Sequence, residues 1–388
     1  MIFDCDNHYY EAIDAFTRHV PKAMQPRCVE WTEIDGRKRH VIAGKLDFSV
    51  GNPLFNPIAR PGVLYDYFKG NPRQKPAAEM MRGDLEPQPA SYRDPSARLA
   101  KMDEQGVETI WLFPTLGVLY EEKLKHDVEA VGTLFTAFNR WLEEDWGLAS
   151  DRIFAAPYIS LASVEHACSE LEWALARDAR IVVMRPAAPW TAAGPRPPGD
   201  QCFDPFWARV NEAGITVVIH TGDSGYSSNG YDSGGFGLAS VSMDSRPSVT
   251  GLVLERAAND FLLDLVYEKV FERFPNVRVA SIENGSSFLP NLLRHLEHAK
   301  QRNPWHFDED PVVMFREHVW INPFWEDDIP EVIELMGPER VIYGSDWPHM
   351  EGLPEPGGIL DEIDGLDERT RNLFLHDSTR QLTKRRPA

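Results

Sequence analysis

Residues 216–220 read TVVIH, and residues 180–184 read RIVVM. Neither run alternates between apolar and polar side chains, as a strand with one face in water would. Continuous runs of this length, rich in Val and Ile, are typical of parallel strands that are covered by helices on both faces. The two stretches therefore predict central strands of a parallel α/β sheet.

Further runs of the same kind lie on both sides of these two, and stretches with helical periodicity separate them. The eight predicted strands are residues 2–8, 107–114, 154–161, 180–186, 216–222, 277–284, 318–323 and 341–347. Eight strands that alternate with helices suit a closed (β/α)₈ TIM barrel better than an open sheet. We expect residues 1–388 to form one such domain, because barrels often exceed the length at which other cores divide.

Two long segments interrupt the alternation. Residues 25–92 separate the first predicted strand from its helix, and residues 223–249 follow the fifth predicted strand. Segments that follow barrel strands lie on the catalytic face, at the carboxyl ends of the strands. The second segment is rich in Gly and Ser, which fits either a mobile lid or an ordinary surface excursion.

Composition excludes several classes of partner. The net charge of −20 argues against nucleic acid and anionic membranes, and no run approaches the ~18 apolar residues of a spanning helix. The four cysteines form no CxxC pair, and the N-terminus resembles no secretion signal. We therefore expect a cytoplasmic protein that acts on a small molecule.

The aromatic content favours self-association. The chain contains 20 Phe and 11 Trp, and a long predicted helix, residues 125–147, carries Trp141 and Trp146. We expect a homodimer or a higher homo-oligomer, with this helix as a candidate contact surface.

Ionisable side chains stand at the carboxyl ends of four predicted strands. They are Asp4, Asp6 and His8 on the first, His220 on the fifth, Glu283 on the sixth, and Asp346 with His349 on the eighth. Each has an ordinary explanation by itself, as a capping or hydrogen-bonded residue. In a barrel, however, all strand ends meet at one mouth, where several carboxylates need a counter-charge. Carboxylates together with imidazoles suit Zn²⁺, Mn²⁺ or Fe²⁺ better than Ca²⁺ or Mg²⁺.

Five motifs around these residues resemble the amidohydrolase superfamily. They are DCDNHYYE at 4–11, ARLAKMDEQGVETIWLFP at 97–114, VVIHTGD at 217–223, ENGSSFLPNLLRHLE at 283–297 and YGSDWPH at 343–349. The resemblance is strongest to the amidohydrolase-2 branch, which includes aminocarboxymuconate-semialdehyde decarboxylase and the hydroxybenzoate decarboxylases. It extends over nearly the whole chain.

The resemblance implies a set of metal ligands. The family's His-x-His of strand one falls on Asp6 and His8, and a carboxylate at the first position resembles the hydroxybenzoate decarboxylases. The family's strand-five histidine falls on His220, and its strand-eight aspartate falls on Asp346. The fourth strand ends in MRP at 184–186, with no lysine for the bridge of binuclear relatives. One divalent ion is therefore implied, with zinc favoured and manganese or iron as alternatives.

The resemblance also implies the chemistry. We expect a metal-dependent hydrolase or non-oxidative decarboxylase of a small aromatic or carboxylated substrate. Asp346 is the expected proton carrier, and Glu283, at the position of a catalytic histidine in many relatives, is the second candidate. A C–C bond hydrolase or a hydratase remains possible. So does a metal-independent or degenerate binding barrel, because Asp6 and Glu283 depart from the usual residues.

Five residues at or beyond the ends of predicted strands are candidates for substrate binding. Arg185 could hold a substrate carboxylate with two hydrogen bonds. Trp190, Tyr226, Phe324 and Trp325 could line an aromatic pocket. Ion pairing for the arginine, and packing under a loop for the aromatic residues, are the alternatives. No motif for a nucleotide cofactor is present in the sequence.

Overall fold

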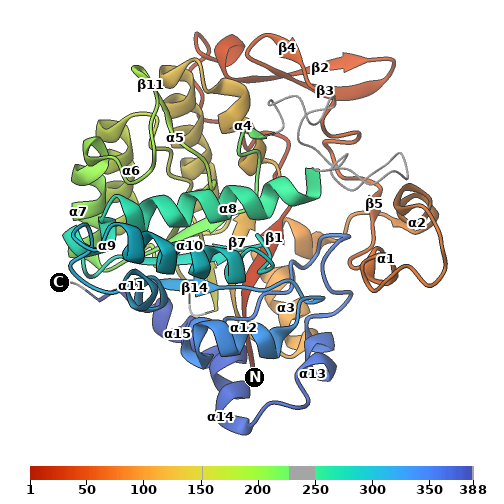
Figure 1. Ribbon diagram of the computed structural model, residues 1–388. Coiled ribbons are helices and arrows are strands. Elements are labelled where there is room, and N and C mark those ends of the chain that lie inside the picture. The colour runs from red at the N-terminus through yellow and green to blue at the C-terminus, as the bar shows by residue number, and fades with distance from the viewer. Residues whose placement is uncertain (151, 227–249, 387–388) are drawn as a thin grey trace.

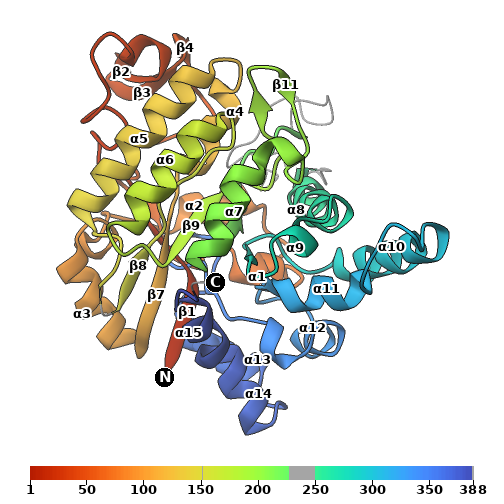
Figure 2. The ribbon, with the colours of Figure 1, turned by 90° about the vertical axis from the view of Figure 1, so that its left-hand side faces the viewer.

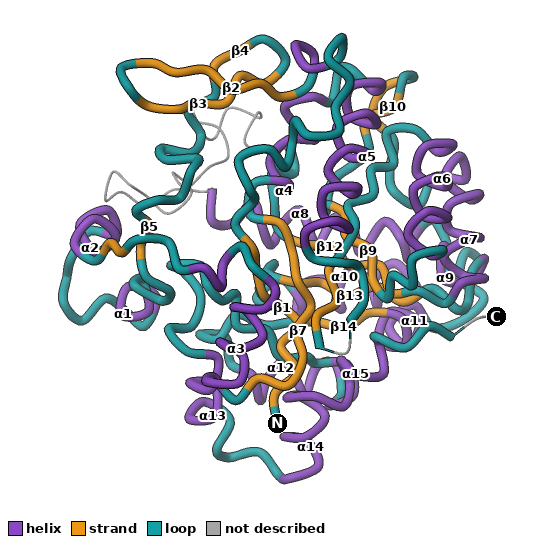
Figure 3. Tube along the Cα trace, turned by 180° about the vertical axis from the view of Figure 1, so that it is seen from behind, coloured by secondary structure: helices purple, strands orange, loops and turns teal. Residues whose placement is uncertain are grey.

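The computed structural model describes residues 1–150, 152–226 and 250–386. A group of parallel strands forms its centre, and helices surround these strands (Figures 1 and 3). The central strands are β1 (Ile2–Tyr9), β7 (Val107–Pro114), β8 (Ile153–Ala155), β9 (Ile181–Met184), β12 (Thr216–His220), β13 (Arg278–Ile282) and β14 (Val319–Ile321). They confirm the first seven predicted strands, although several are shorter than expected.

Backbone hydrogen bonds connect these strands into a ring. One sheet has the order β1-β7-β8 and the other the order β14-β13-β12-β9, with parallel pairs throughout. The amide of Ile159 donates to the carbonyl of Val183 at 2.8 Å, which links the two sheets beyond β8. On the other side, the segment 341–347 lies between β14 and β1: the amide of Ile342 donates to Ile321, and the amide of His8 donates to Trp347. The predicted barrel is confirmed.

The eighth predicted strand pairs through single bridges instead of a regular ladder. Asp346 has a φ of 55°, outside the range of an extended strand. Gly344 approaches β1 so closely that a Cβ atom on it would lie 2.4 Å from the Cβ of Asp6. The absence of a side chain at Gly344 thus allows this segment to bring Asp346 beside Asp6.

The main helices of the described residues lie outside the strands (Figure 2). They are α3 (Pro95–Gln105), α5 (Val128–Asp145), α6 (Val164–Leu175), α7 (Asp204–Ala213), α8 (Thr250–Tyr267), α10 (Leu289–Arg302) and α12 (Ile329–Met336). The ends of α3 follow from its sequence: the side chain of Asp94 accepts a hydrogen bond from the amide of Ala97, and Gly106 ends the helix with a φ of 68°.

The remaining helices of the described residues are mostly shorter. They are α1 (Tyr65–Phe68), α2 (Ala77–Gly83), α4 (Gly117–Leu124), α9 (Val270–Arg273), α11 (Pro311–His318), α13 (Ile359–Glu362), α14 (Glu368–Asn372) and α15 (Ser378–Leu382). None of the helices in the described ranges combines the length and hydropathy that a membrane crossing requires.

The first predicted insertion forms a layer of its own at one end of the barrel. Its sheet of β2 (Val29–Ile34), β3 (Arg37–Ile42) and β4 (Lys45–Leu46) is antiparallel and projects from the body (Figure 1). A second pair, β5 (Ile58–Ala59) and β6 (Leu85–Glu86), lies beside α1 and α2. A short hairpin, β10 (Trp190–Thr191) and β11 (Gly194–Pro195), follows β9. Most of the second predicted insertion, residues 227–249, lies outside the described residues.

The structure corrects the expected contact surface on the long helix. Trp141 and Trp146 are only 1% and 7% exposed, and both rings pack against Tyr9 of β1. Trp141 lies on the apolar face of α5, and Trp146 follows its last turn; both side chains belong to the core. Neither tryptophan is available for contact with a second chain.

Candidate metal centre

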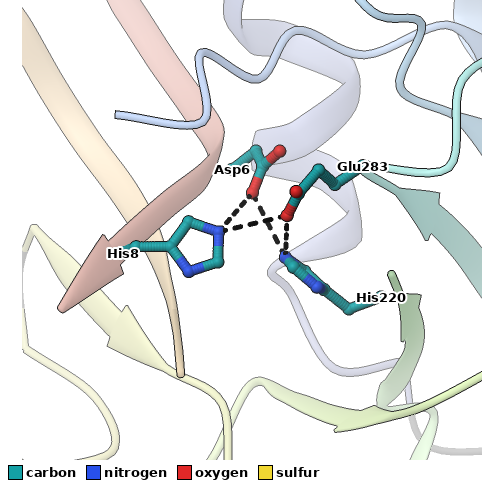
Figure 4. Close-up of side chains that lie close together, drawn as sticks. All are labelled: Asp6, His8, His220 and Glu283. Atoms are coloured by element: carbon teal, nitrogen blue, oxygen red, sulfur yellow. Dashed lines mark hydrogen bonds and ion pairs between the residues drawn. The ribbon is translucent and has the colours of Figure 1, made fainter. Parts of the chain in front are cut away.

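Four side chains point toward one another at the carboxyl ends of β1, β12 and β13 (Figure 4). Asp6 and His8 are two residues apart on β1 and turn toward the same space. His220 is the last residue of β12, and Glu283 follows β13. Asp6, His8 and His220 are buried, and Glu283 is partly buried. The side chains at these strand ends therefore meet, as the barrel prediction implied.

The distances within this group suit the binding of one cation. The Nε2 atom of His8 lies 3.3 Å from Oδ1 of Asp6 and 3.4 Å from Oε2 of Glu283. The Nε2 atom of His220 lies 3.4 Å and 3.2 Å from the same two oxygens. Donor atoms at ~2.0–2.2 Å from a tetrahedral zinc ion would lie about 3.3–3.6 Å from one another. The four donors thus have the spacing of a ligand set.

Backbone carbonyls orient both imidazoles. Nδ1 of His8 lies 3.2 Å from the carbonyl of Pro114, and Nδ1 of His220 lies 2.9 Å from the carbonyl of Thr221. A carbonyl only accepts hydrogen bonds, so Nδ1 is the donor in each ring and Nε2 faces the carboxylates. Partners of this kind fix the ring orientation of metal-binding histidines. The Nε2 atom of His8 has no hydrogen-bond partner among the described residues.

The charges of the group also call for a cation. Burial raises the pKa of Asp346 well above its ordinary value, and the nearby Glu283 and Glu351 raise it further. Burial, together with Glu283, raises the pKa of Glu351 to about 7. Burial lowers the pKa of His8, but the nearby carboxylates of Asp6 and Glu283 outweigh this and raise it to about 10. Protons therefore compensate the carboxylates here, and a divalent ion would replace them.

Asp346 lies at the edge of this group and belongs to an overlapping one. Its Oδ1 atom is 3.4 Å from Nε2 of His8 and 2.6 Å from Nδ1 of His349. The donor atoms of His8, Glu283, Asp346 and His349 lie within 4.8 Å of one another, as do those of Asp6, His8, His220 and Glu283. Glu283, expected from the sequence as a catalytic residue, thus lies in both possible ligand groups.

Two further buried residues, for which the sequence predicted no such role, hold β1 in place. Asp4 accepts hydrogen bonds from the side chain and the amide of Ser345, at 2.6 and 2.9 Å. Arg98 of α3 donates to the carbonyl of His8 at 2.6 Å, and its guanidinium lies 4.8 Å from the ring of Trp347. Asp4 was expected at the same strand end as Asp6, but nothing in the sequence identified Ser345 as its partner.

Arg185, the candidate for binding a substrate carboxylate, already has anionic partners. It is buried at the end of β9, where its guanidinium lies 2.8 Å from Glu122 and 3.4 Å from Glu121. It also donates to the carbonyl of Asp223 at 2.6 Å. Its charge is therefore compensated within the protein, and contact with a substrate stays a prediction.

The four candidate aromatic residues lie in different surroundings. The Trp325 ring is buried and stacks on Tyr65 of the first insertion, with ring centroids 4.5 Å apart. Phe324 lies against Gly285, two residues after Glu283, and is thus near the centre. The other two pack against polar side chains: Lys125 lies 5.0 Å from the ring of Trp190, and the hydroxyl of Tyr226 donates to Asp260. A common aromatic pocket stays a prediction.

Comparison with known proteins identifies the family. The amidohydrolase family model of the amidohydrolase-2 type matches residues 3–382, so the chain belongs to that family and is an enzyme of the superfamily. A solved amidohydrolase from Mycobacterium avium subsp. paratuberculosis K-10 is 38% identical, with a TM-score of 0.91 over 99% of this chain and 97% of that one.

Two decarboxylases are similar to the chain at lower identity. One is a 5-carboxyvanillate decarboxylase from Novosphingobium aromaticivorans, solved with manganese and 4-hydroxy-3-methoxy-5-nitrobenzoic acid. It is 15% identical to this chain, with a TM-score of 0.61, and the match covers 99% of this chain and 96% of that one. It shares the fold. A 2-amino-3-carboxymuconate-6-semialdehyde decarboxylase from Dictyostelium discoideum is 28% identical over 122 residues, which are 29% of this chain and 33% of that protein. The match thus spans about one third of that relative.

We predict that His220→Ala removes the metal and leaves the fold intact. The imidazole contributes a donor atom at the mouth, and its other nitrogen contacts only the adjacent carbonyl of Thr221. Mutation of a residue that only hydrogen-bonds to a metal ligand costs ~10–100-fold in metal affinity. Loss of the ligand itself should weaken zinc binding at least as much. Metal analysis after dialysis, with circular dichroism melting on the same sample, measures both effects. His306→Ala, outside the cluster, is the control; full metal content in His220→Ala would contradict the assignment.

Proposed function

We propose that the chain is a metal-dependent, non-oxidative decarboxylase of a small aromatic acid. The observation that carries the proposal is the convergence of Asp6, His8, His220 and Glu283 on one space, with Asp346 at its edge. Membership of the amidohydrolase family supports it, as do the decarboxylase activities named for two relatives.

For the metal, we propose Asp6, His8, His220 and Asp346 as ligands, with Glu283 as a further donor at ligand distance. The chemistry supplied by a bound divalent ion is the polarisation of substrate oxygens. Zinc remains favoured by the mixed carboxylate and imidazole donors, and the manganese in the carboxyvanillate decarboxylase makes manganese the first alternative.

In the proposed reaction, the bond between the ring carbon and the carboxylate carbon breaks and CO₂ leaves. The ring carbon takes up one proton, so a C–H bond replaces the C–C bond. We propose Asp346 as the donor of this proton, because one carboxylate oxygen can remain free while the other holds the ion. Glu283 is the second candidate. Solvent then returns a proton to the donor, so each turnover consumes one proton from solution.

The acidity of the site favours substrate binding through the ion. Asp6, Glu283, Asp346 and Glu351 offer no positive charge to a substrate carboxylate, and Arg185 is engaged by glutamates. An aromatic acid should therefore bind only after metal is loaded. We propose Phe324, which lies near the centre, and Trp325, which stacks on Tyr65 of the first insertion, as aromatic contacts for the substrate ring.

The function is tested by incubating the metal-loaded protein with a panel of phenolic acids, among them 2,6-dihydroxybenzoate and 5-carboxyvanillate. We expect CO₂ release from at least one acid, and its loss after chelation or in His220→Ala. Aryl esters, amides and diketones whose C–C bond can be hydrolysed are incubated with the protein in parallel. Turnover of those compounds without CO₂ release from any acid would replace the decarboxylase with a hydrolase.

We predict that Asp346→Asn keeps part of the metal and loses kcat by ~10²-fold or more, the usual contribution of a positioned acid–base group. The amide keeps an oxygen that can bind the ion, but it cannot exchange a proton. Metal content and kcat are measured on one preparation, beside Glu283→Gln. Near-normal turnover in a fully metallated Asp346→Asn variant would mean that Glu283, and not Asp346, donates the proton.

We also propose that the chain forms a homo-oligomer through the projecting sheet of the first insertion. Leu46 and Phe48 there are 44% and 66% exposed. Arg37, Lys38 and Lys45 are exposed beside them in a chain with a net charge of −20. A second copy of the chain offers acidic surface for these cations, and burial of the apolar side chains would stabilise the contact.

We predict that the double variant Leu46→Ser/Phe48→Ser is monomeric in light scattering at micromolar concentration, while the unmodified chain is oligomeric. Trp305→Ser removes a side chain that is 79% exposed on another surface, and is the control. An oligomer that persists in the double variant would place the interface elsewhere.

A further inference from the structure

The hydrogen bonds of His349 determine which of its nitrogens carries a hydrogen. Nε2 of His349 lies 2.9 Å from the hydroxyl of Thr115. That hydroxyl donates its single hydrogen to the carbonyl of Tyr9, at 2.7 Å. A hydroxyl whose hydrogen is used in this way can only accept from its second neighbour. Nε2 of His349 is therefore the donor.

The other nitrogen of His349 is then a bare acceptor when the ring is neutral. Nδ1 faces Oδ1 of Asp346 at 2.6 Å, and that oxygen is also an acceptor once the carboxyl group has lost its proton, as it must to bind an ion. Both atoms are buried, and neither makes a hydrogen bond within the described part of the chain. Two acceptors at this distance repel each other unless a positive species lies between or beside them.

A third buried atom without a partner lies next to this pair. Nε2 of His8 is 3.4 Å from the same oxygen of Asp346, and the imidazoles of His8 and His349 stack with ring centroids 3.9 Å apart. Glu283 completes the group of four whose donor atoms lie within 4.8 Å of one another. His349 itself is 9% exposed. These donors, from three separate segments, thus surround one point.

We propose that His349 is an additional ligand of the metal centre, which binds the ion through Nδ1 while Thr115 holds its Nε2–H. This proposal rests on the metal dependence proposed above. Thr115 acts as a positioning residue, because its hydroxyl selects the tautomer whose Nδ1 lone pair faces the centre. The ligand set thereby extends beyond Asp346 to the end of the YGSDWPH motif.

The test measures zinc affinity by competition with a chromophoric chelator, and coordination by the visible absorption of Co²⁺ in the same site. We expect His349→Phe, which keeps a ring against His8, to weaken zinc binding by ~10-fold or more and to change the Co²⁺ spectrum. Thr115→Val keeps the shape but frees the tautomer, and should also weaken binding. Thr115→Ser restores the hydroxyl and should bind zinc like the unmodified chain.

A second threonine–histidine pair provides a matched control. The hydroxyl of Thr136 lies 2.7 Å from Nε2 of His166 and donates to Glu170, between α5 and α6. Thr136→Val and His166→Phe should leave zinc affinity and the Co²⁺ spectrum unchanged.

The outcomes separate this proposal from the proposed function. If the unmodified chain binds neither Zn²⁺ nor Co²⁺, the metal dependence is wrong and this assignment fails with it. If the unmodified chain binds them, and His349→Phe and Thr115→Val bind equally well with the same spectrum, His349 is not a ligand and the proposed function stands. Should His349→Phe not fold, the comparison of Thr115→Val with Thr115→Ser decides alone.

Discussion

The buried carboxylate of Asp4 joins the first and last strands of the ring. Its oxygens accept from the backbone and side chain of Ser345, the amide of Asp6 and the side chain of Asn7. The pKa of Asp4 is raised to about 6, because burial opposes ionisation more strongly than the hydrogen bonds from Ser345 and Asn7 favour it. The segment 341–347 pairs only through single bridges, so this junction, together with the close approach at Gly344, positions Asp346 against Asp6 and His8.

The junction concentrates negative charge where the strands end. Asp6 and Asp346 meet because their backbones are bonded: the amide of Asp346 donates to the carbonyl of Asp6 at 2.9 Å. Both Asp346 and Glu283 have positive φ angles, of 55° and 54°, which are strained for residues with a side chain. Strain and like-charge repulsion in one place destabilise the fold unless a bound species compensates for them. The centre therefore has the properties of a binding site.

Much of this arrangement could be predicted from the sequence. Non-alternating runs gave the order of the strands, and the barrel topology then implied that Asp6, His8, His220 and Asp346 would meet. Such reasoning uses only the position of a residue along its strand. It placed Glu283 at the same mouth but could not distinguish a ligand from a catalytic residue there, because both roles use a side chain at a strand end. The family position of a catalytic histidine pointed to a different role.

Residues that act through side-chain contacts between distant segments were harder to predict. The pairing of Thr115 with His349 joins positions 234 residues apart, and no local pattern marks it. The tryptophans on and after α5 were misplaced for a related reason. Aromatic content alone does not distinguish a contact surface from a core, and the ring of Tyr9 that covers both tryptophans belongs to β1.

The replacement of a histidine by Glu283 has a consequence for the proposed chemistry. When fully ionised, the three carboxylates of Asp6, Glu283 and Asp346 would carry three negative charges, and a divalent ion would compensate for two of them. With a substrate carboxylate added, the net charge of the three carboxylates, the ion and the substrate would be minus two, in a site of low dielectric constant. If one of the three carboxylates keeps a proton, this net charge is minus one. Decarboxylation consumes one proton at the ring carbon, so the proton that allows an anionic substrate to bind is also the one that the reaction requires.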